Sequence, residues 1–347
     1  MRSLLIIQDM RGWFWKTYPT PNQTKSLDTR IIVTELAKCD FEVQLTRYDR
    51  FDFSKNYTGH YVLYGSSEDY LGGSKSYMDD ILLWLELHGA ILIPNYKYFR
   101  AHHNKVMMEL LRQDFSGAEF KTIQSTVLPS ASSGQAIQAR LPLPAVIKSA
   151  SGAGSTGVYL ARTARDMQIA IRKASCQVSG FPYTWIQLHN LLQFLKRKAP
   201  LYVNNSKYVV QNLIPGLAGD YKVLIFGQRY FALYRLNRTN DFRASGSGRF
   251  VDREDPELFQ VLDFARRCHQ EIDSPFVSLD IAHDGQQAHL IEFQCVSFGF
   301  KAMSLSDHHY VSTTGHWQRL DGPVVPELIF SQAIMDYVAA RDASRIC

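Results

Sequence analysis

The sequence lacks the features that mark disulfide-rich, zinc-ribbon and membrane-spanning proteins. Its five cysteines lie far apart with no C-x-x-C pair, which argues against a disulfide framework or a zinc ribbon and is typical of a reducing compartment. Only four consecutive apolar residues, 4–7, occur near the N-terminus, fewer than a signal peptide needs. The apolar stretch 81–94 contains Glu86 and His88 and is too short to cross a bilayer. We therefore expect a cytoplasmic protein with no membrane partner.

An excess of one charge sign is also missing. The 347 residues include 38 basic and 33 acidic side chains, a net charge of +5, and no basic block of the kind that forms a nucleic-acid arm. We expect no nucleic-acid partner. Hydrophobic residues make up 46% of the chain, enough for the cores of two or three domains of ordinary size.

The order of predicted strands and helices differs between the first, middle and last parts of the chain, and together the parts predict a mixed α/β (α+β) protein. Strands alternate with helices in the first part, which predicts a parallel sheet, with strands at 3–9, 41–48, 60–67 and 90–94 and helices at 28–38 and 76–89. In the middle part we expect strands at 121–129, 143–150 and 158–163 and helices at 104–112, 165–174 and 184–198. The last part predicts antiparallel hairpins of strands at 207–214, 220–227, 229–236, 274–285 and 287–294, with helices at 255–270 and 324–340. The predicted domains are 1–95, 96–206 and 207–347.

The stretch VIKSASGAGSTGV (146–158) places Lys148 before three glycines spelled G-x-G-x-x-G. A dinucleotide fingerprint has such glycines between a strand and a helix, whereas a strand is predicted on each side here. Walker A and protein-kinase loops have their lysine after the glycines. Two interpretations remain. The hairpin folds over nucleotide phosphates that Lys148 also reaches, or it is an ordinary surface hairpin.

A second pattern lies in VSLDIAHDG and HLIEFQ, near the end of the chain. Glu292 and Gln294 are two residues apart and therefore share one face of their strand, and a turn at 284–285 brings Asp280 close to them. Two carboxylates and an amide oxygen are ligands that Mg²⁺ prefers. The alternative is an exposed sheet face. However, Glu292 lies between two apolar residues, where an unpaired carboxylate is costly.

Four motifs in order, PAVIKSASGAGSTGV, YVVQNLI with GDYKVLIF, ALYRLNRTNDFRASGSG, and SLDIAHDG with LIEFQ, resemble the ATP-grasp superfamily. The nearest likeness is to its ribosomal-protein-glutamate ligase and glutathione-synthetase-like branch, over about residues 95–345. The resemblance implies an N-terminal parallel-sheet pre-grasp domain, a small central β-rich domain with a glycine lid, and a C-terminal antiparallel-sheet domain with a metal-binding hairpin. It also implies an ATP- and Mg²⁺-dependent ligase. Such an enzyme joins a carboxylate to an amine through an acyl phosphate and releases ADP and phosphate.

The resemblance implies roles for individual positions. The nucleotide-binding positions are Lys105, Lys148, Ser151, Gly152, Gly154, Ser155, Gly157, Gln211, Asn212, Leu213, Ile214, Asp220 and Lys222. Arginines that meet the γ-phosphate and the developing acyl phosphate correspond to Arg235 and Arg243. The Mg²⁺ ligands correspond to Asp280, Glu292 and Gln294.

Three positions depart from the family pattern. The E-x-N pair is E-x-Q at Gln294, the D-x-R motif ends in Lys222 and loses a bidentate fork, and the hinge glutamate is Asn212. None removes a metal carboxylate, so we expect an active enzyme acting on small-molecule or peptide carboxylates and amines. Two alternatives stay open, namely a kinase that leaves phosphate on its acceptor and a non-catalytic ATP-binding module. Relatives often form oligomers, so a homo-oligomer is a further expectation.

Two other groups invite a functional interpretation. The pair His308–His309 is expected to chelate metal poorly, because adjacent residues point in different directions. Asp9, Arg11 and Lys16 follow the end of the first strand, where acceptor recognition is an option, while core packing explains some of their aromatic neighbours.

Overall fold

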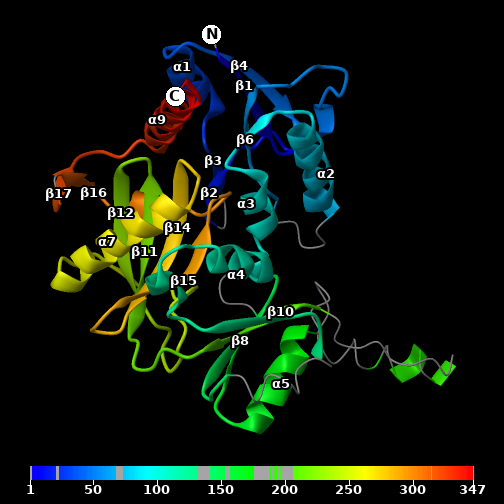
Figure 1. Cartoon of the computed structure of the whole chain (residues 1–347), viewed down its shortest axis with the longest axis vertical. Coiled ribbons are helices and arrows are strands. Elements are labelled where there is room, and N and C mark those ends of the chain that lie inside the picture. The colour runs from blue at the N-terminus through cyan, green and yellow to red at the C-terminus, as the bar shows by residue number, and fades with distance from the viewer. Residues whose placement is uncertain are drawn as a thin grey trace.

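The computed structural model describes residues 2–20, 23–67, 73–131, 141–152, 157–175, 188, 191–193, 195–196, 206–313 and 315–346. Within them the strands form a four-stranded sheet near the N-terminus, a four-stranded sheet in the middle of the chain and a seven-stranded C-terminal sheet (Figure 1). No helix in this part of the chain is both long and apolar enough to cross a membrane.

The N-terminal sheet is parallel, as its alternation of strands and helices predicts. Its strand order is β4 (Phe41–Arg47), β1 (Arg2–Gln8), β5 (Tyr61–Tyr64) and β6 (Ile91–Ile93). The helices of this region are α1 (Thr29–Ala37), α2 (Gly73–Leu87) and the short 3-10 turn η1 (Tyr48–Arg50). A hairpin of β2 (Lys16–Thr20) and β3 (Gln23–Ser26) was not predicted, because its residues are mostly polar.

The central sheet is antiparallel, with the order β7 (Ser125–Leu128), β10 (Tyr208–Asn212), β8 (Ala145–Ser149) and β9 (Val158–Ala161). Its neighbours along the chain are α3 (Tyr96–Ala101), α4 (Lys105–Gln113), η2 (Ala118–Lys121) and α5 (Ala164–Ser175). The expectation that β10 forms a hairpin with the following strand was wrong, since β10 pairs with β7 and β8. The reason is packing, because Tyr208 and Val210 complete the small core beneath α5.

The C-terminal sheet is antiparallel and confirms the two predicted hairpins β11–β12 and β14–β15. Its order is β15 (Ala288–Gln294), β14 (Phe276–His283), β11 (Gly219–Phe226), β12 (Arg229–Leu236), β16 (His308–Thr313) and β17 (His316–Asp321), with β13 (Phe250–Val251) beside β12. The helices are α7 (Pro256–Glu271), α8 (Lys301–Leu305) and α9 (Pro326–Ile346). The β16–β17 hairpin was not predicted, because its largely polar residues show no clear apolar alternation.

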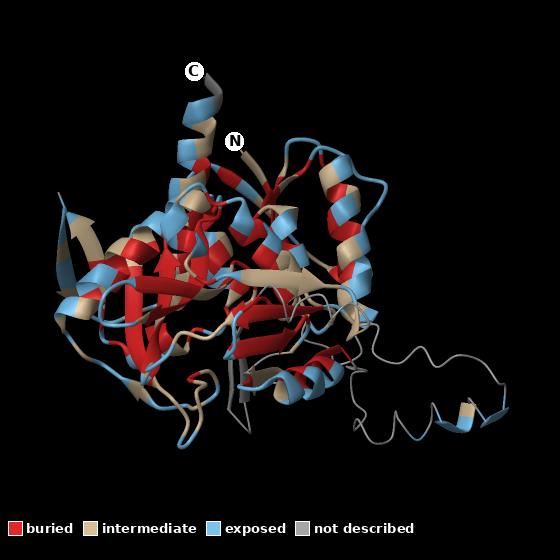
Figure 2. Ribbon diagram, turned by 60° about the horizontal axis from the view of Figure 1, so that its bottom comes forward, coloured by how far each residue is buried: buried red, intermediate tan, exposed pale blue. Residues whose placement is uncertain are grey.

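The outer two sheets share their hydrophobic cores, whereas the central sheet has a core of its own. Leu5 of β1 belongs to one shared cluster with Val223 of β11, and Leu4 belongs to a second with Leu224. Successive residues of each strand belong to different clusters because side chains along a strand alternate between the two faces of the sheet. Figure 2 shows the buried residues concentrated in the sheets. The candidate site residues come from the central and C-terminal sheets and from α4, which packs on β7 and β10 and also contributes Met108 to a shared core.

Candidate nucleotide and metal site

Four charged residues form a balanced cluster across three neighbouring strands of the C-terminal sheet. Register places Asp220 opposite Arg235 and Lys222 opposite Asp280. Arg235 donates from Nε to Asp220 Oδ1 at 2.8 Å and from Nη2 to Asp220 Oδ2 at 2.7 Å. The same Nη2 donates to Asp280 Oδ2 at 2.8 Å, and Lys222 Nζ donates to Asp280 Oδ1 at 2.7 Å. Two cations and two carboxylates thus compensate one another where little solvent enters.

Asp280 is held in its ionised form by this cluster. Burial alone raises the pKa of its carboxyl group, but the charges and hydrogen bonds of Arg235 and Lys222 outweigh burial and hold that pKa well below its usual range. Both carboxylate oxygens accept a hydrogen bond from these residues. Each oxygen has a second lone-pair direction, so the hydrogen bonds do not prevent Asp280 from also binding a cation.

The three predicted metal ligands are brought together on β14 and β15. Asp280 and Glu292 face each other in the register, next to a β-bulge. Gln294 Nε2 donates to Glu292 Oε1 at 3.1 Å, so the amide oxygen of Gln294 is turned away from that carboxylate. The two carboxylates are hard donors that fit Mg²⁺, and the amide group of Gln294 would have to rotate for its oxygen to join them.

The glycine loop joins two strands, as the sequence predicts, and not a strand to a helix. Lys148 of β8 is the register partner of Val158 in β9, and Ser149 N donates to Gly157 O at 2.8 Å. Gly152 and Gly157 have φ values of +126° and +75°, which other residues rarely adopt. Gly154 and Ser155 lie outside the described residues, so their predicted roles stay predictions.

The two predicted phosphate lysines lie at the base of this hairpin. Lys105 begins α4, and its Nζ donates to Gly152 O at 2.8 Å. Its backbone N–H donates to Ala150 O at 2.8 Å, so the N-terminus of α4 is attached to the first half of the loop. Lys148 is 7% exposed, and nothing in the described part of the chain hydrogen-bonds to its Nζ. This ammonium group is therefore available to an anion.

Burial lowers the pKa of Lys148, while the negative charges of Glu292 and Glu109 act in the opposite direction. Glu292 belongs to the metal-ligand set on the C-terminal sheet, and Lys148 to the glycine hairpin of the central sheet. The two halves of the candidate site are therefore close enough to interact electrostatically.

Arg243 connects the two sheets, whereas the hydrogen bonds of the hinge lie within the central part of the chain. Arg243 pairs with Asp241 at 2.6 Å and donates from Nη1 to Val158 O at 3.2 Å, so it reaches the second strand of the glycine hairpin. In the hinge, Asn212 N donates to Gln124 O at 3.1 Å and Leu213 N to Pro144 O at 3.3 Å. Ile214 follows, and the side chain of Gln211 is buried among protein groups.

No protein-family model and no curated protein matches the sequence. Solved structures match almost the whole chain at low identity. D-cycloserine synthetase DcsG matches with a TM-score of 0.53 and 14% identity, over 96% of this chain and 99% of that protein. The RimK domain ATP-grasp protein from Sphaerobacter thermophilus DSM 20745 matches with a TM-score of 0.52 and 11% identity, over 97% and 99%. The ATP-grasp ligase PsnB, complexed with minimal precursor, Mg and ADP, matches with a TM-score of 0.51 and 12% identity, over 96% of each chain.

The chain has the ATP-grasp fold. The predicted fold class is therefore confirmed, while the predicted domain boundaries and the roles of single residues stay predictions. In this ATP-grasp chain, the boundary expected at 206–207 falls just before β10, whose partners belong to the central sheet.

A buried ion pair of α4, Glu109 with Arg112, was missed by the sequence interpretation. Glu109 Oε2 lies 2.5 Å from Arg112 Nη2, and both side chains are almost fully buried. Their spacing of three residues on an amphipathic helix was the available signal, but that spacing is equally common on exposed helix faces.

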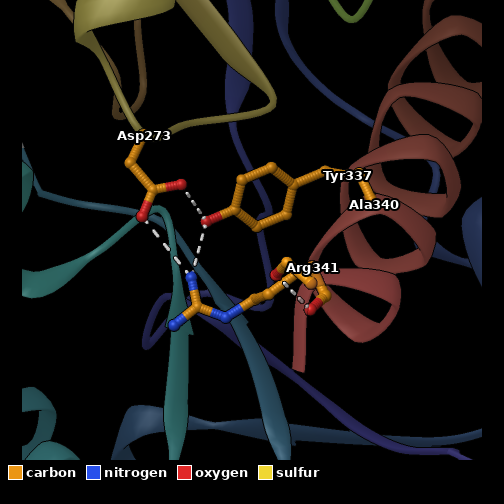
Figure 3. Close-up of a pocket in the computed structure, with 5 residues that line it drawn as sticks. Asp273, Tyr337, Ala340 and Arg341 are labelled. Atoms are coloured by element: carbon orange, nitrogen blue, oxygen red, sulfur yellow. Dashed lines mark hydrogen bonds and ion pairs between the residues drawn. The ribbon is translucent and has the colours of Figure 1, made fainter. Parts of the chain in front are cut away.

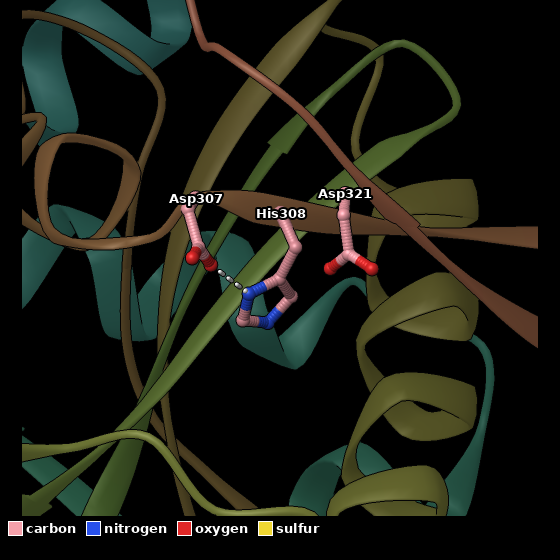
Figure 4. A group of neighbouring side chains, drawn as sticks. All are labelled: Asp307, His308 and Asp321. Atoms are coloured by element: carbon pink, nitrogen blue, oxygen red, sulfur yellow. Dashed lines mark hydrogen bonds and ion pairs between the residues drawn. The ribbon is translucent and has the colours of Figure 1, made fainter.

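Two other groups of side chains lie outside the candidate site of this ATP-grasp fold. At the base of the β16–β17 hairpin, His308 Nδ1 lies 3.0 Å from Asp307 Oδ1, with Asp321 nearby (Figure 4). Arg319 Nε already pairs with Asp321 at 2.8 Å, so a cation there would compete with an arginine. Of the His308–His309 pair, His308 is the member of this group.

A surface pocket of about 380 Å³ lies beside α9, where Tyr337 and Arg341 both contact Asp273 (Figure 3). Of the predicted site residues that the structure describes, none lines this pocket. The candidate acceptor residue Asp9 shapes its own loop, since its Oδ1 accepts from Arg11 N at 2.9 Å and from Trp13 N at 2.8 Å. The side chain of Lys16 lies outside the described residues.

Proposed function

We propose that the protein is an ATP- and Mg²⁺-dependent ligase that joins a carboxylate to an amine through an acyl phosphate and releases ADP and phosphate. The observation that carries the proposal is the geometry of two half-sites. Lys148 lies at the base of the glycine hairpin, whose second strand accepts a hydrogen bond from Arg243, and Glu292 faces Asp280 on the neighbouring strand. The fold supports it, because structural neighbours of the same fold are described as a synthetase and as a ligase complexed with minimal precursor, Mg and ADP.

Each half-site has a distinct part in this reaction. Lys105 and Lys148 bind the phosphates, and the glycine hairpin covers them and keeps water away from the reactive acyl phosphate. Asp280, Glu292 and Gln294 would hold Mg²⁺, which would supply positive charge to neutralise the phosphates. Arg235 and Lys222 are hydrogen-bonded to Asp220 and Asp280, so they would add net positive charge for the developing negative charge only when Asp280 is shared with Mg²⁺.

The bond changes need no side-chain nucleophile. An oxygen of the substrate carboxylate attacks the γ-phosphorus, and ADP leaves. The amine nitrogen of the second substrate then attacks the acyl carbon, phosphate leaves, and the nitrogen loses its proton. The substrates we propose are small-molecule or peptide carboxylates and amines, handled by a cytoplasmic enzyme.

A hydroxylamine trap tests this function directly. The full chain is incubated with ATP, Mg²⁺, hydroxylamine and a pool of carboxylates, and hydroxamates and nucleotides are measured by mass spectrometry. A hydroxamate formed together with ADP supports the proposal and identifies the carboxylate. AMP in place of ADP would show an acyl adenylate, and a stable phosphorylated acceptor would show a kinase. Tight ATP binding without any product over a broad pool would favour a non-catalytic module.

A further inference from the structure

The carboxylate of Glu109 lies buried between the helix that carries Lys105 and the strand that leads into the hinge. Lys105 and Glu109 are one helical turn apart on the same side of α4. Glu109 is 1% exposed, although it is neither a predicted nucleotide contact nor a metal ligand. A buried carboxylate is costly unless its oxygens are hydrogen-bonded and its charge is paired.

All of these requirements are met by neighbouring groups. Glu109 Oε1 accepts from Gln211 Nε2 at 2.7 Å. Its Oε2 accepts from Ser125 Oγ at 2.6 Å and from Arg112 Nε and Nη2 at 3.1 and 2.5 Å. Arg112 also donates to the carbonyl oxygens of Phe120 and Ile123, both at 2.9 Å, and so fixes the segment that leads into β7.

The two residues that Glu109 joins through its separate oxygens are themselves register partners. Gln211 of β10 faces Ser125 of β7 in the last registered pair before the hinge. Gln211 is itself the first position of the segment that the family resemblance assigns to adenine, and Asn212 follows it. Glu109 therefore holds the end of the β7–β10 ladder at a fixed distance from the N-terminus of α4, where Lys105 lies.

We propose that Glu109 is a positioning residue for the nucleotide base. Through Gln211 it sets where residues 212–214 lie, so that the base and the phosphates are bound at the correct separation. The proposal rests on the proposed function, because it takes the hinge to be the adenine site. Its particular consequence is that the Glu109–Gln211 bond matters for ligands that contain the base and not for the phosphate chain alone.

The test compares binding of three probes by isothermal titration calorimetry at pH 8: ATP with Mg²⁺, adenosine, and inorganic tripolyphosphate with Mg²⁺. Gln211→Met keeps the side-chain length but removes the donor to Glu109. We expect its affinity for ATP and for adenosine to fall about tenfold, because a small displacement of the hinge weakens its contacts with the base. Its affinity for tripolyphosphate should stay within about twofold of the wild-type value. Asp114→Asn, at the exposed end of the same helix, is the matched control and should bind all three probes like the wild type.

A charge exchange distinguishes positioning from general damage. Gln211→Glu places two carboxylates against each other and should weaken ATP binding. The double variant Glu109→Gln with Gln211→Glu restores a donor and an acceptor at the same place and should recover affinity to within about threefold of wild type. Melting temperatures identify variants that do not fold, and if Gln211→Met is one of them, the two charge variants decide.

Unchanged ATP affinity in Gln211→Met, an equal loss for tripolyphosphate, or no recovery in the double variant would each overturn the positioning role. A wild type that binds none of the three probes would instead overturn the proposed function itself, and the positioning role with it.

Discussion

Lys222 Nζ donates a 2.7 Å hydrogen bond to Asp280 Oδ1, between residues that face each other in the register of β11 and β14. Asp280 is also the carboxylate that we assign to Mg²⁺. Under this assignment the ammonium group of Lys222 and the metal ion would be two cations sharing one carboxylate, and each would weaken the binding of the other. This relationship gives the departure from D-x-R to D-x-K in the sequence a physical consequence that can be measured.

Lys222→Met removes one of the two cations beside Asp280. We expect Mn²⁺, used as a probe for Mg²⁺, to bind roughly fivefold more tightly without nucleotide, because less positive charge opposes it. Turnover should fall about tenfold or more, because the same charge no longer stabilises the reacting phosphate. Mn²⁺ titration followed by electron paramagnetic resonance measures the first effect. Lys38→Met, an exposed control at the C-terminal cap of α1, should change neither quantity. Unaltered Mn²⁺ affinity in Lys222→Met would contradict the shared-carboxylate interpretation.

Glu292→Ala tests the metal assignment. Glu292 faces Asp280 in the register and is held by Gln294, so its removal takes away one of two carboxylates that we assign to Mg²⁺. We expect ADP formation in the hydroxylamine assay to fall by about a thousandfold or more, with the melting temperature little changed because the side chain is not in the core. Glu42→Ala on the exposed edge strand β4 is the control. Near-normal turnover in Glu292→Ala would show that this pair does not hold the metal.

Lys148 predicts a particular pH dependence of ATP binding. Burial lowers the pKa of its ammonium group. As the pH rises, Lys148 therefore loses its proton earlier than an exposed lysine, whose pKa is about 10.4. ATP affinity should therefore be full at neutral pH and decline as the pH rises through the lowered pKa. Lys148→Arg keeps its charge throughout this range, so its affinity should stay constant where that of the wild type declines. Calorimetric titrations between about pH 7 and 10, with melting curves at each pH, provide the measurement, and a flat wild-type profile would count against Lys148 as a phosphate ligand.

Asp284 stabilises the turn between β14 and β15, the strands that carry the predicted metal ligands. Its Oδ1 accepts from Gln286 N at 2.9 Å and Gln287 N at 2.8 Å, and its Oδ2 contacts His289 Nε2 at 2.9 Å. Asp284→Ala should lower the free energy of unfolding by about 1–2 kcal/mol, whereas Asp284→Asn, which keeps one acceptor oxygen, should lose less. Urea denaturation at neutral pH measures both.

The same turn has an acid dependence with a defined sign. Hydrogen bonds from the Gln287 backbone and from His289 hold the pKa of Asp284 well below its usual range. The stabilisation is therefore present above the ordinary aspartate pKa of about 3.9 and is lost as the pH falls through the lower value in the folded state. The difference in unfolding free energy between wild type and Asp284→Ala should shrink when the pH is lowered below about 3. A difference that stays constant in acid would mean that the carboxylate charge does not contribute.

Local patterns in the sequence determined the parts of this protein that depend on neighbouring residues. The strand, lysine, glycine loop and strand around Lys148 could be identified because alternation and glycine content fix a hairpin within about a dozen residues. The Asp284–Gly285 turn between β14 and β15 could be identified for the same reason. The order of these segments then sufficed to predict the ATP-grasp fold.

Only the tertiary structure decided which charges are buried together. Lys222 and Asp280 are 58 positions apart, and Glu109 and Gln211 are 102 apart, so no local pattern connects either pair. A glutamate in an amphipathic helix is ordinarily solvated, and Glu109 is buried because Arg112, Ser125 and Gln211 surround it. The pairing of β10 with β7 and β8 was likewise decided by tertiary packing and not by a local pattern. Strand pairing and charge burial depend on which surfaces meet after folding, and the free energy of those contacts is not recorded in the spacing of residues along the chain.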